Sequence, residues 1–583
     1  MGTVTLLTLL LALGCQRIPA PADPPTLRQL PAERQAERFL VSAAHPLAVE
    51  AGLEVLRRGG SAVDAAVAVQ LALGFVEAPE TGIGGGGFLL YYDAGTGVVR
   101  FFDGRETAPA AAGPARFQLF GLAVPRWLAI PTGRAVGVPG LVAMLELAHA
   151  ELGQLPWAEL SGPAIRMAED GVPMPQRLRE QSRADFSLRL FADLRERFVT
   201  PASAAEPVLR NPAYAATLRT LAEDGPRAFY NGEIAARLVK RVGARRPWRS
   251  DMTLDDLHAY RALERAPVCG PYREWTVCGA PPPSSGGVAV LQILGMLERF
   301  ELAELGADSA IARHLLVEAH RLAFADRERY LGDPAFVDVP LAALLDADYL
   351  RRRSLLIDPE RALDRALPGA PAAAPLGEPA RAPSAAPGGT SHFTVVDGAG
   401  NIVALTSSIE APFGSRMSSD GFLLNNQLTD FAFRPYDGDR AHPNAVAPGK
   451  RPRSSMSPVI VLDAQGEPRL AIGARGGPRI IAHVVKTLVG ILDWDLEIQE
   501  AINMPNFVYA GDRLELERNT PLAARQAEFA ARGHKVRAVE LTSGLHGIER
   551  TASGWRGGAD WRMDGVARGD RATLTGEQKN HDR

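Results

Sequence analysis

A hydroxyl residue placed directly after a double glycine and ahead of two β-rich runs constrains this chain more than any other feature. Thr390 follows Gly388 and Gly389, and the runs cover 391–397 and 401–408, with Gly-Ala-Gly between them. β-branched and aromatic residues joined by a short glycine-rich connection predict a β-hairpin. Thr390 is therefore expected at the start of the first strand of this hairpin.

The symmetry of the hairpin predicts what lies opposite Thr390. If the strands pair symmetrically about Ala399, Thr390 faces Ser408, and the two hydroxyl groups lie within hydrogen-bonding distance. Because side chains alternate along a strand, Glu410 is expected on the same face as Ser408. A single β-bulge would change this geometry.

This junction has the chemistry of a self-cleavage site. Gly389 lacks a Cβ and tolerates a strained backbone, so the Thr390 hydroxyl can attack the Gly389 carbonyl. An N-to-O acyl shift and hydrolysis would then free the Thr390 amine. An α-amino group has a pKa of about 7.7 to 8.0 and can serve as the general base for its own hydroxyl. The alternative is an ordinary junction between a loop and a strand.

Further motifs extend over most of the chain. They cover residues 59–66, 82–88, 103–109, 138–140, 281–287, 325–327, 330–334, 390–396, 423–427, 430–431, 451–458 and 476–477. In this order they resemble the γ-glutamyltransferases (γ-glutamyltranspeptidases), a family of the N-terminal nucleophile hydrolase superfamily. The resemblance runs from about residue 39 to about residue 570. It implies an α/β fold, a four-layer αββα sandwich built jointly from a large and a small subunit.

The resemblance also implies roles for individual residues. Thr390 corresponds to the nucleophile and Ser408 to a supporting hydroxyl residue, which is usually Thr in the family. Arg105, with Ser454 and Ser455, corresponds to the clamp for the α-carboxylate of a γ-glutamyl group. An arginine suits this task because its planar fork can bind a carboxylate through two hydrogen bonds.

The remaining site residues follow from the same resemblance. Glu410, Gln427 and Asp430 correspond to the group around the α-ammonium of the substrate, and the amides of Gly476 and Gly477 to the oxyanion hole. Many members of the family carry Asn at the position of Glu410. Two carboxylates would attract an ammonium group, so γ-glutamyl donors such as glutathione are expected over glutaryl side chains.

The resemblance therefore implies a self-processed enzyme that passes a γ-glutamyl group from its Thr ester to water, amino acids or peptides, without a cofactor. Two alternatives stay open. One is a glutaryl or cephalosporin acylase on the same scaffold, and the other is an unprocessed, exported binding protein.

The predicted domains follow from the cleavage site. A large subunit covers 39–389 and ends in an Ala/Pro-rich linker at 367–389, which is expected to be disordered, and a small catalytic subunit covers 390–583. The segment 434–453 is expected to hold a lid loop, with Tyr436 either covering the site or exposed.

The amino terminus predicts export. An apolar run at 4–13 is too short to span a bilayer but suits a secretory signal over 1–15. Cys15 ends an imperfect lipobox, so a periplasmic lipoprotein and a plainly cleaved periplasmic or secreted protein are both open. Residues 16–38, rich in Pro and Ala, are interpreted as a tether.

The other two cysteines flank a predicted hairpin. A two-residue turn at Arg273 and Glu274 would place Cys269 opposite Cys278, which predicts a disulfide in an exported protein. The alternative is two buried free thiols.

Composition and spacing exclude several other classes of function. A net charge of −3 without a basic stripe gives no support for nucleic-acid binding. The glycine run at 84–87 lacks the Lys-Ser/Thr of a phosphate loop, and no cluster has metal-ligand spacing. Helices are expected at 47–56, 62–73 and 314–330, and a hairpin at 88–92 and 98–102.

Overall fold

The predicted hairpin forms the centre of a seven-stranded sheet. The computed structural model describes residues 34–199, 206–372, 388–438 and 440–570. In it, β12 (Gly389–Val396) pairs antiparallel with β13 (Ile402–Glu410), in a register centred on Ala399 from Ser391 opposite Ser407 onward. The sheet has the order β25-β2-β12-β13-β3-β4-β9. Its other strands are β2 (Leu40–Ala43), β3 (Gly86–Asp93), β4 (Val98–Gly104), β9 (Leu263–Arg265) and β25 (Val566–Gly569).

A second seven-stranded sheet lies against the first. Strands β12 and β13 contact β19 across the gap between the sheets, and β12 also contacts β23. The order of this sheet is β1-β24-β23-β19-β18-β11-β10. Its strands are β1 (Gln35–Ala36), β10 (Val268–Tyr272), β11 (Trp275–Gly279), β18 (Val459–Leu462), β19 (Pro468–Gly473), β23 (His546–Thr551) and β24 (Gly554–Ala559).

Alternating side chains along the central strands build two separate hydrophobic cores. Phe393 and Val395 point to one core, which they share with the helices on the outer face of the first sheet. Val396 and Ile402 point to the other core, together with strands and helices of the second sheet. Both faces of the central strands are therefore covered, which explains why every residue of β12 and β13 is buried.

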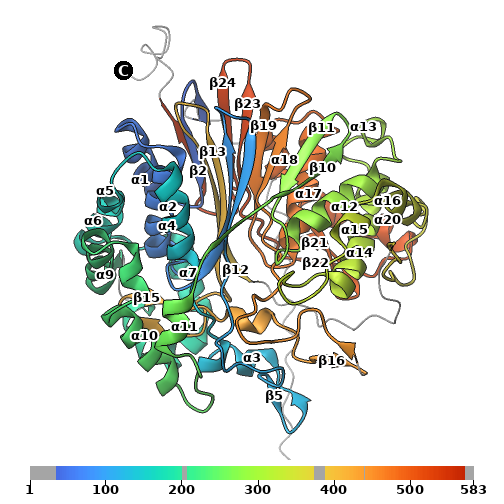
Figure 1. Cartoon of the computed structure of the whole chain (residues 1–583). Helices are drawn as coiled ribbons and strands as arrows, with labels where there is room; N and C mark the ends of the chain where they lie inside the picture. The colour runs from blue at the N-terminus through green and yellow to red at the C-terminus, as the bar shows by residue number, and fades with distance from the viewer. Residues whose placement is uncertain (1–33, 200–205, 373–387, 439, 571–583) are drawn as a thin grey trace, which may run out of the picture.

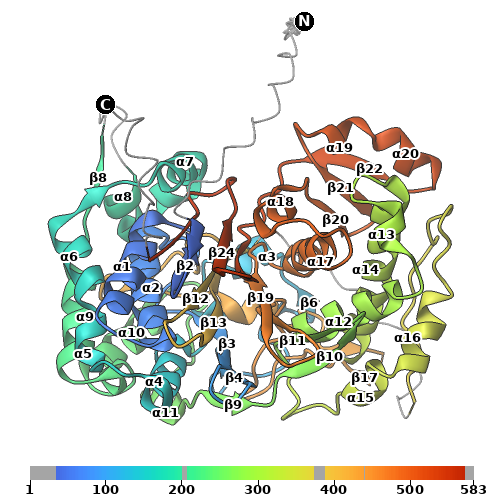
Figure 2. The same ribbon diagram turned by 90° about the horizontal axis from the view of Figure 1, so that it is seen from above.

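Helices flank the two sheets on their outer sides (Figures 1 and 2). Helices α1 (Pro46–Arg57), α2 (Ala62–Val76) and α4 (Leu141–Leu152) pack on the first sheet, and α12 (Gly286–Leu297) and α17 (Arg479–Leu492) pack on the second. Helix α14 (Ala310–Tyr330) packs against α12. The predicted helices and the hairpin β3–β4 are confirmed.

The sequence of α2 shows why this helix lies inside the molecule. The helix is apolar on nearly all sides, as expected for a buried helix. Its first turn is fixed by a capping box between Ser61 and Asp64.

Shorter elements surround the two sheets and the helices that cover them. They are α5 (Trp157–Leu160), α6 (Gly162–Asp170), α7 (Gln176–Ala184), α8 (Ala192–Phe198), α9 (Pro212–Glu223), α10 (Glu233–Ala244), α11 (Leu254–Ala259), α13 (Leu302–Leu305), α15 (Leu341–Leu344), α16 (Ala347–Ser354), α18 (Ile498–Asn503), α19 (Pro521–Ala524), α20 (Gln526–Ala531), β20 (Phe507–Ala510), β21 (Arg513–Glu517) and β22 (Val536–Val539).

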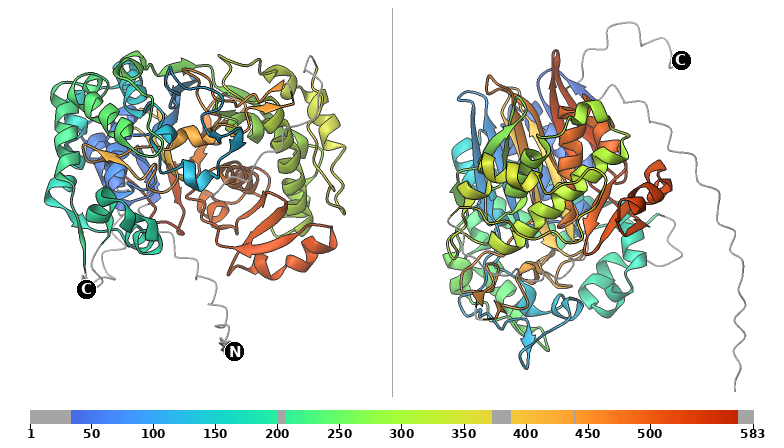
Figure 3. Two further views of the ribbon diagram at one scale, coloured as in Figure 1. Left: turned by 90° about the horizontal axis from the view of Figure 1, so that it is seen from below. Right: turned by 90° about the vertical axis from the view of Figure 1, so that its right-hand side faces the viewer.

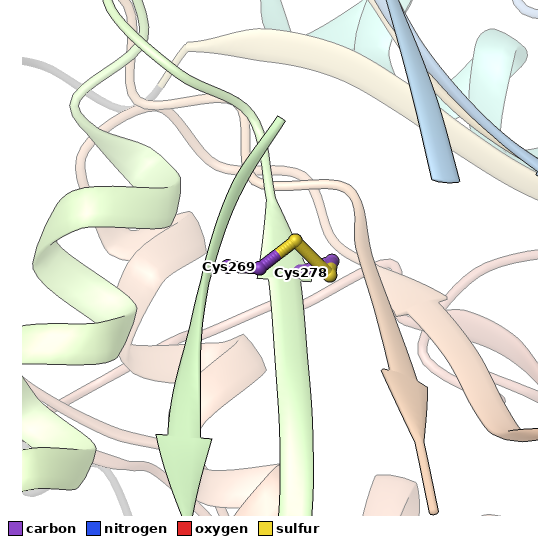
Figure 4. Close-up of a disulfide and its surroundings, with 2 residues drawn as sticks. All are labelled: Cys269 and Cys278. Carbon is purple, nitrogen blue, oxygen red and sulfur yellow. A yellow bond between two sulfur atoms is a disulfide. The ribbon is translucent and has the colours of Figure 1, made fainter. Parts of the chain in front are cut away.

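The predicted disulfide is confirmed. Strands β10 and β11 are joined by a two-residue turn in which Arg273 has a left-handed backbone, with a φ of 53°. The register pairs Cys269 with Cys278, and their sulfur atoms are bonded (Figure 4). The two cysteines thus link the edge strand of the second sheet to its neighbour.

Two predicted segment boundaries are corrected. The last residues of the predicted tether belong to the fold, because β1 pairs with β24. The predicted linker begins later than 367, because Arg353 donates to the Leu367 carbonyl (2.9 Å) and the Gly369 amide donates to Asp326 (2.7 Å). Residues 373–387 of the linker and the predicted signal with Cys15 lie outside the described residues. Among the helices that the structure describes, none is long and apolar enough to cross a bilayer.

Candidate active site

Thr390 lies at a β-bulge, where the regular register of the hairpin ends. Gly389 pairs with Glu410 instead of Ile409, the partner that the register of the other pairs would give, so the pairing shifts between Gly389 and Ser391. The Thr390 hydroxyl donates to the Gly389 carbonyl oxygen at 2.7 Å and to Ser408 Oγ at 3.3 Å. The prediction that Ser408 lies within hydrogen-bonding distance is confirmed, although the bulge falls at Thr390 itself.

Ser408 acts on the carbonyl that precedes Thr390. Its hydroxyl donates to the Gly389 oxygen at 2.6 Å, while its oxygen accepts from the Glu410 amide at 2.9 Å. The Gly389 carbonyl therefore has hydroxyl donors from both Thr390 and Ser408. The Ser408 hydroxyl is placed to stabilise the negative charge that develops on this oxygen when its carbonyl is attacked.

Gly389 is enclosed so tightly that a larger residue would not fit without a shift. A Cβ at this position would lie 2.8 Å from a carboxylate oxygen of Glu80 and 3.2 Å from the Pro412 nitrogen. Glu80 is buried and forms an ion pair with Arg475. Neither Glu80 nor Arg475 was predicted from the sequence, since they lie 395 residues apart.

Gly476 and Gly477, which follow β19 of the second sheet, lie close to the peptide bond between Gly389 and Thr390. They precede α17 and have φ angles of 118° and 60°, which favour glycine. A Cβ on Gly388 would lie 3.5 Å from Gly477 Cα, so the two double glycines are neighbours. The positive end of the helix dipole favours negative charge at the start of α17, as at the N-terminus of any helix.

Arg105 is held in the interior, close to the predicted serine pair. Its side chain is 1% exposed, and it donates to the carbonyls of Pro452 (3.0 Å) and Arg453 (3.1 Å). Ser454 and Ser455 follow directly in the chain. The hydroxyl of Ser454 accepts from the Met456 amide (3.1 Å), and that of Ser455 accepts from Arg327 (2.8 Å). The structure thus brings the three predicted residues together.

The predicted ammonium-binding group also converges. Gln427 and Asp430 lie on a short 3₁₀ helix, η5 (Gln427–Asp430), and Gln427 donates to Asp430 Oδ2 at 2.7 Å. Asp430 Oδ2 accepts from Arg105 at the same distance, 2.7 Å. Asn426, which was not among the predicted site residues, donates to Glu410 Oε2.

An arginine that was not predicted joins these carboxylates. Arg126 opens α3 (Arg126–Ala129), and its Nη2 donates to Glu410 Oε1 and to Asp430 Oδ1, the latter at 3.1 Å. Its Nη1 donates to the Thr429 carbonyl. A guanidinium thus bridges Glu410 and Asp430, the two carboxylates that the resemblance places around a substrate ammonium.

The charges in this group shift its pKa values in different directions. Burial would raise the pKa of Asp430, but Arg105 and Arg126 outweigh it and hold that pKa below its usual value. Burial raises the pKa of Glu410, against the effect of Arg126, and the charge of Asp430 raises it further. Burial also lowers the pKa of Arg126, but the two carboxylates outweigh this effect and raise it. Arg126 is therefore a permanent cation in the site.

Arg126 belongs to a segment that packs beside the start of the predicted lid segment, 434–453. The hairpin β5 (Gln118–Leu119) and β6 (Leu122–Ala123) precedes α3, and Phe117 stacks on Phe433 with ring centroids 4.5 Å apart. These elements lie below the two sheets in Figure 1 and side by side in the view from below (Figure 3). Tyr436 begins β16 (Tyr436–Asp437) and is 56% exposed, so of the two alternatives the structure supports the exposed one.

Three potential metal ligands converge elsewhere, in contrast to the sequence prediction. His314 and Glu318 of α14 meet His534, with ligand atoms within 4.8 Å of one another. His314 Nδ1 lies 2.7 Å from His534 Nε2, and Glu318 pairs with Arg321 at 2.7 Å. Spacing could not predict this cluster because His534 lies 220 residues from His314. The cluster is internally hydrogen-bonded, and we assign no ion to it.

Two facing sheets, with a hydroxyl residue beginning a central strand beside a glycine pair, define an enzyme of the N-terminal nucleophile hydrolase class. The gamma-glutamyltranspeptidase family profile matches residues 48–569. The chain belongs to the gamma-glutamyltranspeptidase family.

Relatives with two different activities in their names resemble this chain. The glutathione hydrolase proenzyme of Bacillus subtilis (strain 168) is 36% identical over 479 residues, which cover 80% of each chain. The Acylase ACY 1 proenzyme of Pseudomonas sp. (strain SE83) is 34% identical over 566 residues, 94% of this chain and 97% of its own. The crystal structure of cephalosporin acylase from Bacillus halodurans has a TM-score of 0.81 at 26% identity and covers 95% of this chain and 99% of its own.

Proposed function

We propose that this chain is a precursor that cleaves itself before Thr390 and then transfers or hydrolyses γ-glutamyl groups. The observation that carries the proposal is the contact of the Thr390 hydroxyl with the Gly389 carbonyl, at 2.7 Å, while Ser408 donates to the same oxygen at 2.6 Å. A nucleophile and a donor to the developing oxyanion thus meet at one peptide bond.

The processing step is an N-to-O acyl shift. Thr390 Oγ attacks the Gly389 carbonyl carbon, and the hydroxyl proton passes to the Thr390 nitrogen as the C–N bond breaks. Water then hydrolyses the ester and leaves a Gly389 carboxylate and a free Thr390 amine. We propose that the large subunit (39–389) and the small subunit (390–583) stay associated in a four-layer αββα sandwich.

Turnover uses the freed amine as the general base. Thr390 Oγ attacks the γ-carbonyl of the donor, the Thr390 amine takes the hydroxyl proton, and the amides of Gly476 and Gly477 stabilise the oxyanion. The leaving amine receives the proton and departs. The γ-glutamyl ester on Thr390 is resolved by water or by the amine of an amino acid or peptide, which gives ping-pong kinetics.

Glutathione is the proposed donor, since the relatives include glutathione hydrolase proenzymes. Arg105, with Ser454 and Ser455, is proposed to bind the donor carboxylate. The apolar run at 4–13 and the disulfide Cys269–Cys278 support export to the periplasm or beyond, with Cys15 as a candidate lipid anchor.

Intact-mass spectrometry of the purified protein after incubation at neutral pH tests processing, and glutamate release from glutathione tests turnover. We expect two chains, the smaller beginning at Thr390, and ping-pong initial rates when an acceptor dipeptide is added. A single chain that stays intact for days and releases no glutamate would favour the exported binding protein instead.

Ser408 provides a test of the processing step alone. Replacing it by Ala removes a donor to the Gly389 oxygen, so we expect processing to slow roughly a hundredfold. Ser408→Thr keeps the hydroxyl and should process at a rate close to that of the wild type. The rate of conversion from one chain to two, followed by denaturing gel electrophoresis, measures both. Equal rates for Ser408→Ala and the wild type would remove Ser408 from the mechanism.

An acylase that removes glutaryl-type side chains is the second candidate. It is favoured by one observation, the ion pairs of Arg126 with both Glu410 and Asp430. These pairs neutralise the charges that would otherwise attract an ammonium group on the donor.

A further inference from the structure

Arg126 occupies the position in which a donor ammonium would have to bind. A γ-glutamyl group that kept its ammonium between Glu410 and Asp430 would use the oxygens that now accept from Arg126, namely Glu410 Oε1 and Asp430 Oδ1. The other oxygens of these carboxylates are also engaged. Asn426 donates to Glu410 Oε2, and Arg105 and Gln427 donate to Asp430 Oδ2.

The charges around Glu410 and Asp430 also disfavour the binding of a donor ammonium. Glu410 and Asp430 face two guanidinium groups, those of Arg105 and Arg126. Burial raises the pKa of the neighbouring Glu106 to about 8, so this carboxyl is mostly neutral at pH 7. Two anions and two cations leave no excess negative charge for an incoming ammonium. Without Arg126, the same group would carry one uncompensated negative charge and would favour a cationic substituent.

The guanidinium of Arg126 can move away from the carboxylates more easily than that of Arg105. Its side chain is 28% exposed, while that of Arg105 is 1% exposed. Arg126 belongs to a four-residue helix whose next residue, Trp127, is 70% exposed. The guanidinium of Arg126 can therefore leave the carboxylates toward solvent without opening the hydrophobic core.

We propose that Arg126 sets the donor selectivity of this site, by competing with the α-ammonium of γ-glutamyl donors and by favouring acyl donors that carry a terminal carboxylate but no α-ammonium. This inference rests on the proposed function, because it uses the same nucleophile and the same carboxylate clamp. Glutaryl amides are the simplest members of this class of donor. They differ from γ-glutamyl amides only in lacking the ammonium group.

Two chromogenic donors with the same leaving group isolate this effect. We compare kcat/KM for γ-glutamyl-p-nitroanilide and glutaryl-p-nitroanilide with wild type, Arg126→Ala and Arg126→Lys, each checked for complete processing. The expected result is that Arg126→Ala raises the γ-glutamyl to glutaryl ratio at least tenfold, chiefly through KM. Arg126→Lys, which keeps a cation, should leave the ratio within about threefold of the wild type. Trp127→Ala, in the same short helix, is the control and should not change the ratio.

A measurement on the wild type covers the case in which Arg126→Ala fails to fold. We expect glutarate to inhibit the processed enzyme at least as strongly as L-glutamate, which carries the additional ammonium group. This inference alone is overturned if Arg126→Ala leaves the γ-glutamyl to glutaryl ratio of kcat/KM unchanged. It is also overturned if L-glutamate inhibits the wild type ten times more strongly than glutarate does. Processed wild-type enzyme that cleaves neither donor overturns the proposed function and the inference together.

Discussion

Replacing Thr390 by alanine is expected to leave the precursor as a single chain and to abolish turnover. Without its hydroxyl, residue 390 can attack neither the Gly389 carbonyl, which the hydroxyl now contacts at 2.7 Å, nor a donor amide. Loss of a covalent nucleophile lowers rates by roughly a thousandfold to a millionfold. Intact-mass spectrometry and release of p-nitroaniline from γ-glutamyl-p-nitroanilide are the two measurements.

Thr390→Ser is the matched control. It keeps the hydroxyl and removes only a methyl group, so it should yield two chains and retain activity within about one order of magnitude of the wild type. If Thr390→Ala were processed at the same site, or turned over the donor at the wild-type rate, Thr390 could not be the nucleophile.

Replacing Arg105 by lysine is expected to separate turnover from processing. The lysine keeps a positive charge but loses the planar fork that now bonds two backbone carbonyls and Asp430. We expect kcat/KM for the γ-glutamyl donor to fall roughly a hundredfold, since charge-assisted hydrogen bonds contribute about 1.5 to 3 kcal/mol each. Processing should continue at the wild-type rate, because its contacts among Gly389, Thr390 and Ser408 do not include Arg105.

The comparison needs both rates from the same preparations. Conversion of the precursor is followed by gel electrophoresis, and the processed fraction alone is used for steady-state kinetics. A melting temperature close to that of the wild type shows that the loss is local. Unchanged kcat/KM in processed Arg105→Lys would mean that Arg105 does not bind the donor carboxylate.

The central hairpin could be predicted because its information is local. Alternation along 391–397 and 401–408 and the glycine-rich connection between them determine both the strands and the register. The disulfide between Cys269 and Cys278 follows from the same kind of reasoning, since a two-residue turn fixes which residues face each other. The bulge at Thr390 could not be located in this way. It depends on contacts beyond the hairpin, including the close packing of Gly389 against Glu80 and Pro412.

The position of Arg126 shows what local patterns leave out. Its partners Glu410 and Asp430 lie 284 and 304 residues away, and nothing in the spacing of charges around 126 distinguishes it from a solvated surface arginine. The resemblance to the family predicted the carboxylates but not the cation between them. The placement of Arg126 between these carboxylates depends on how the chain before Thr390 folds against the chain after it, which only the tertiary structure shows.

The order of strands in the first sheet has a consequence for how the active enzyme can be obtained. Strand β2 lies between β12 and β25, and β12 and β13 separate β2 from β3, so strands from before and after the proposed cleavage site alternate in one hydrogen-bonded ladder. Neither half can complete this sheet alone, and each would present unpaired strand edges prone to aggregation. The uncut chain thus serves as the template for assembly, and denatured enzyme whose chain has already been cut would have to recover its structure by an encounter of two molecules. Recombinant production should accordingly use the full-length gene rather than two separate halves.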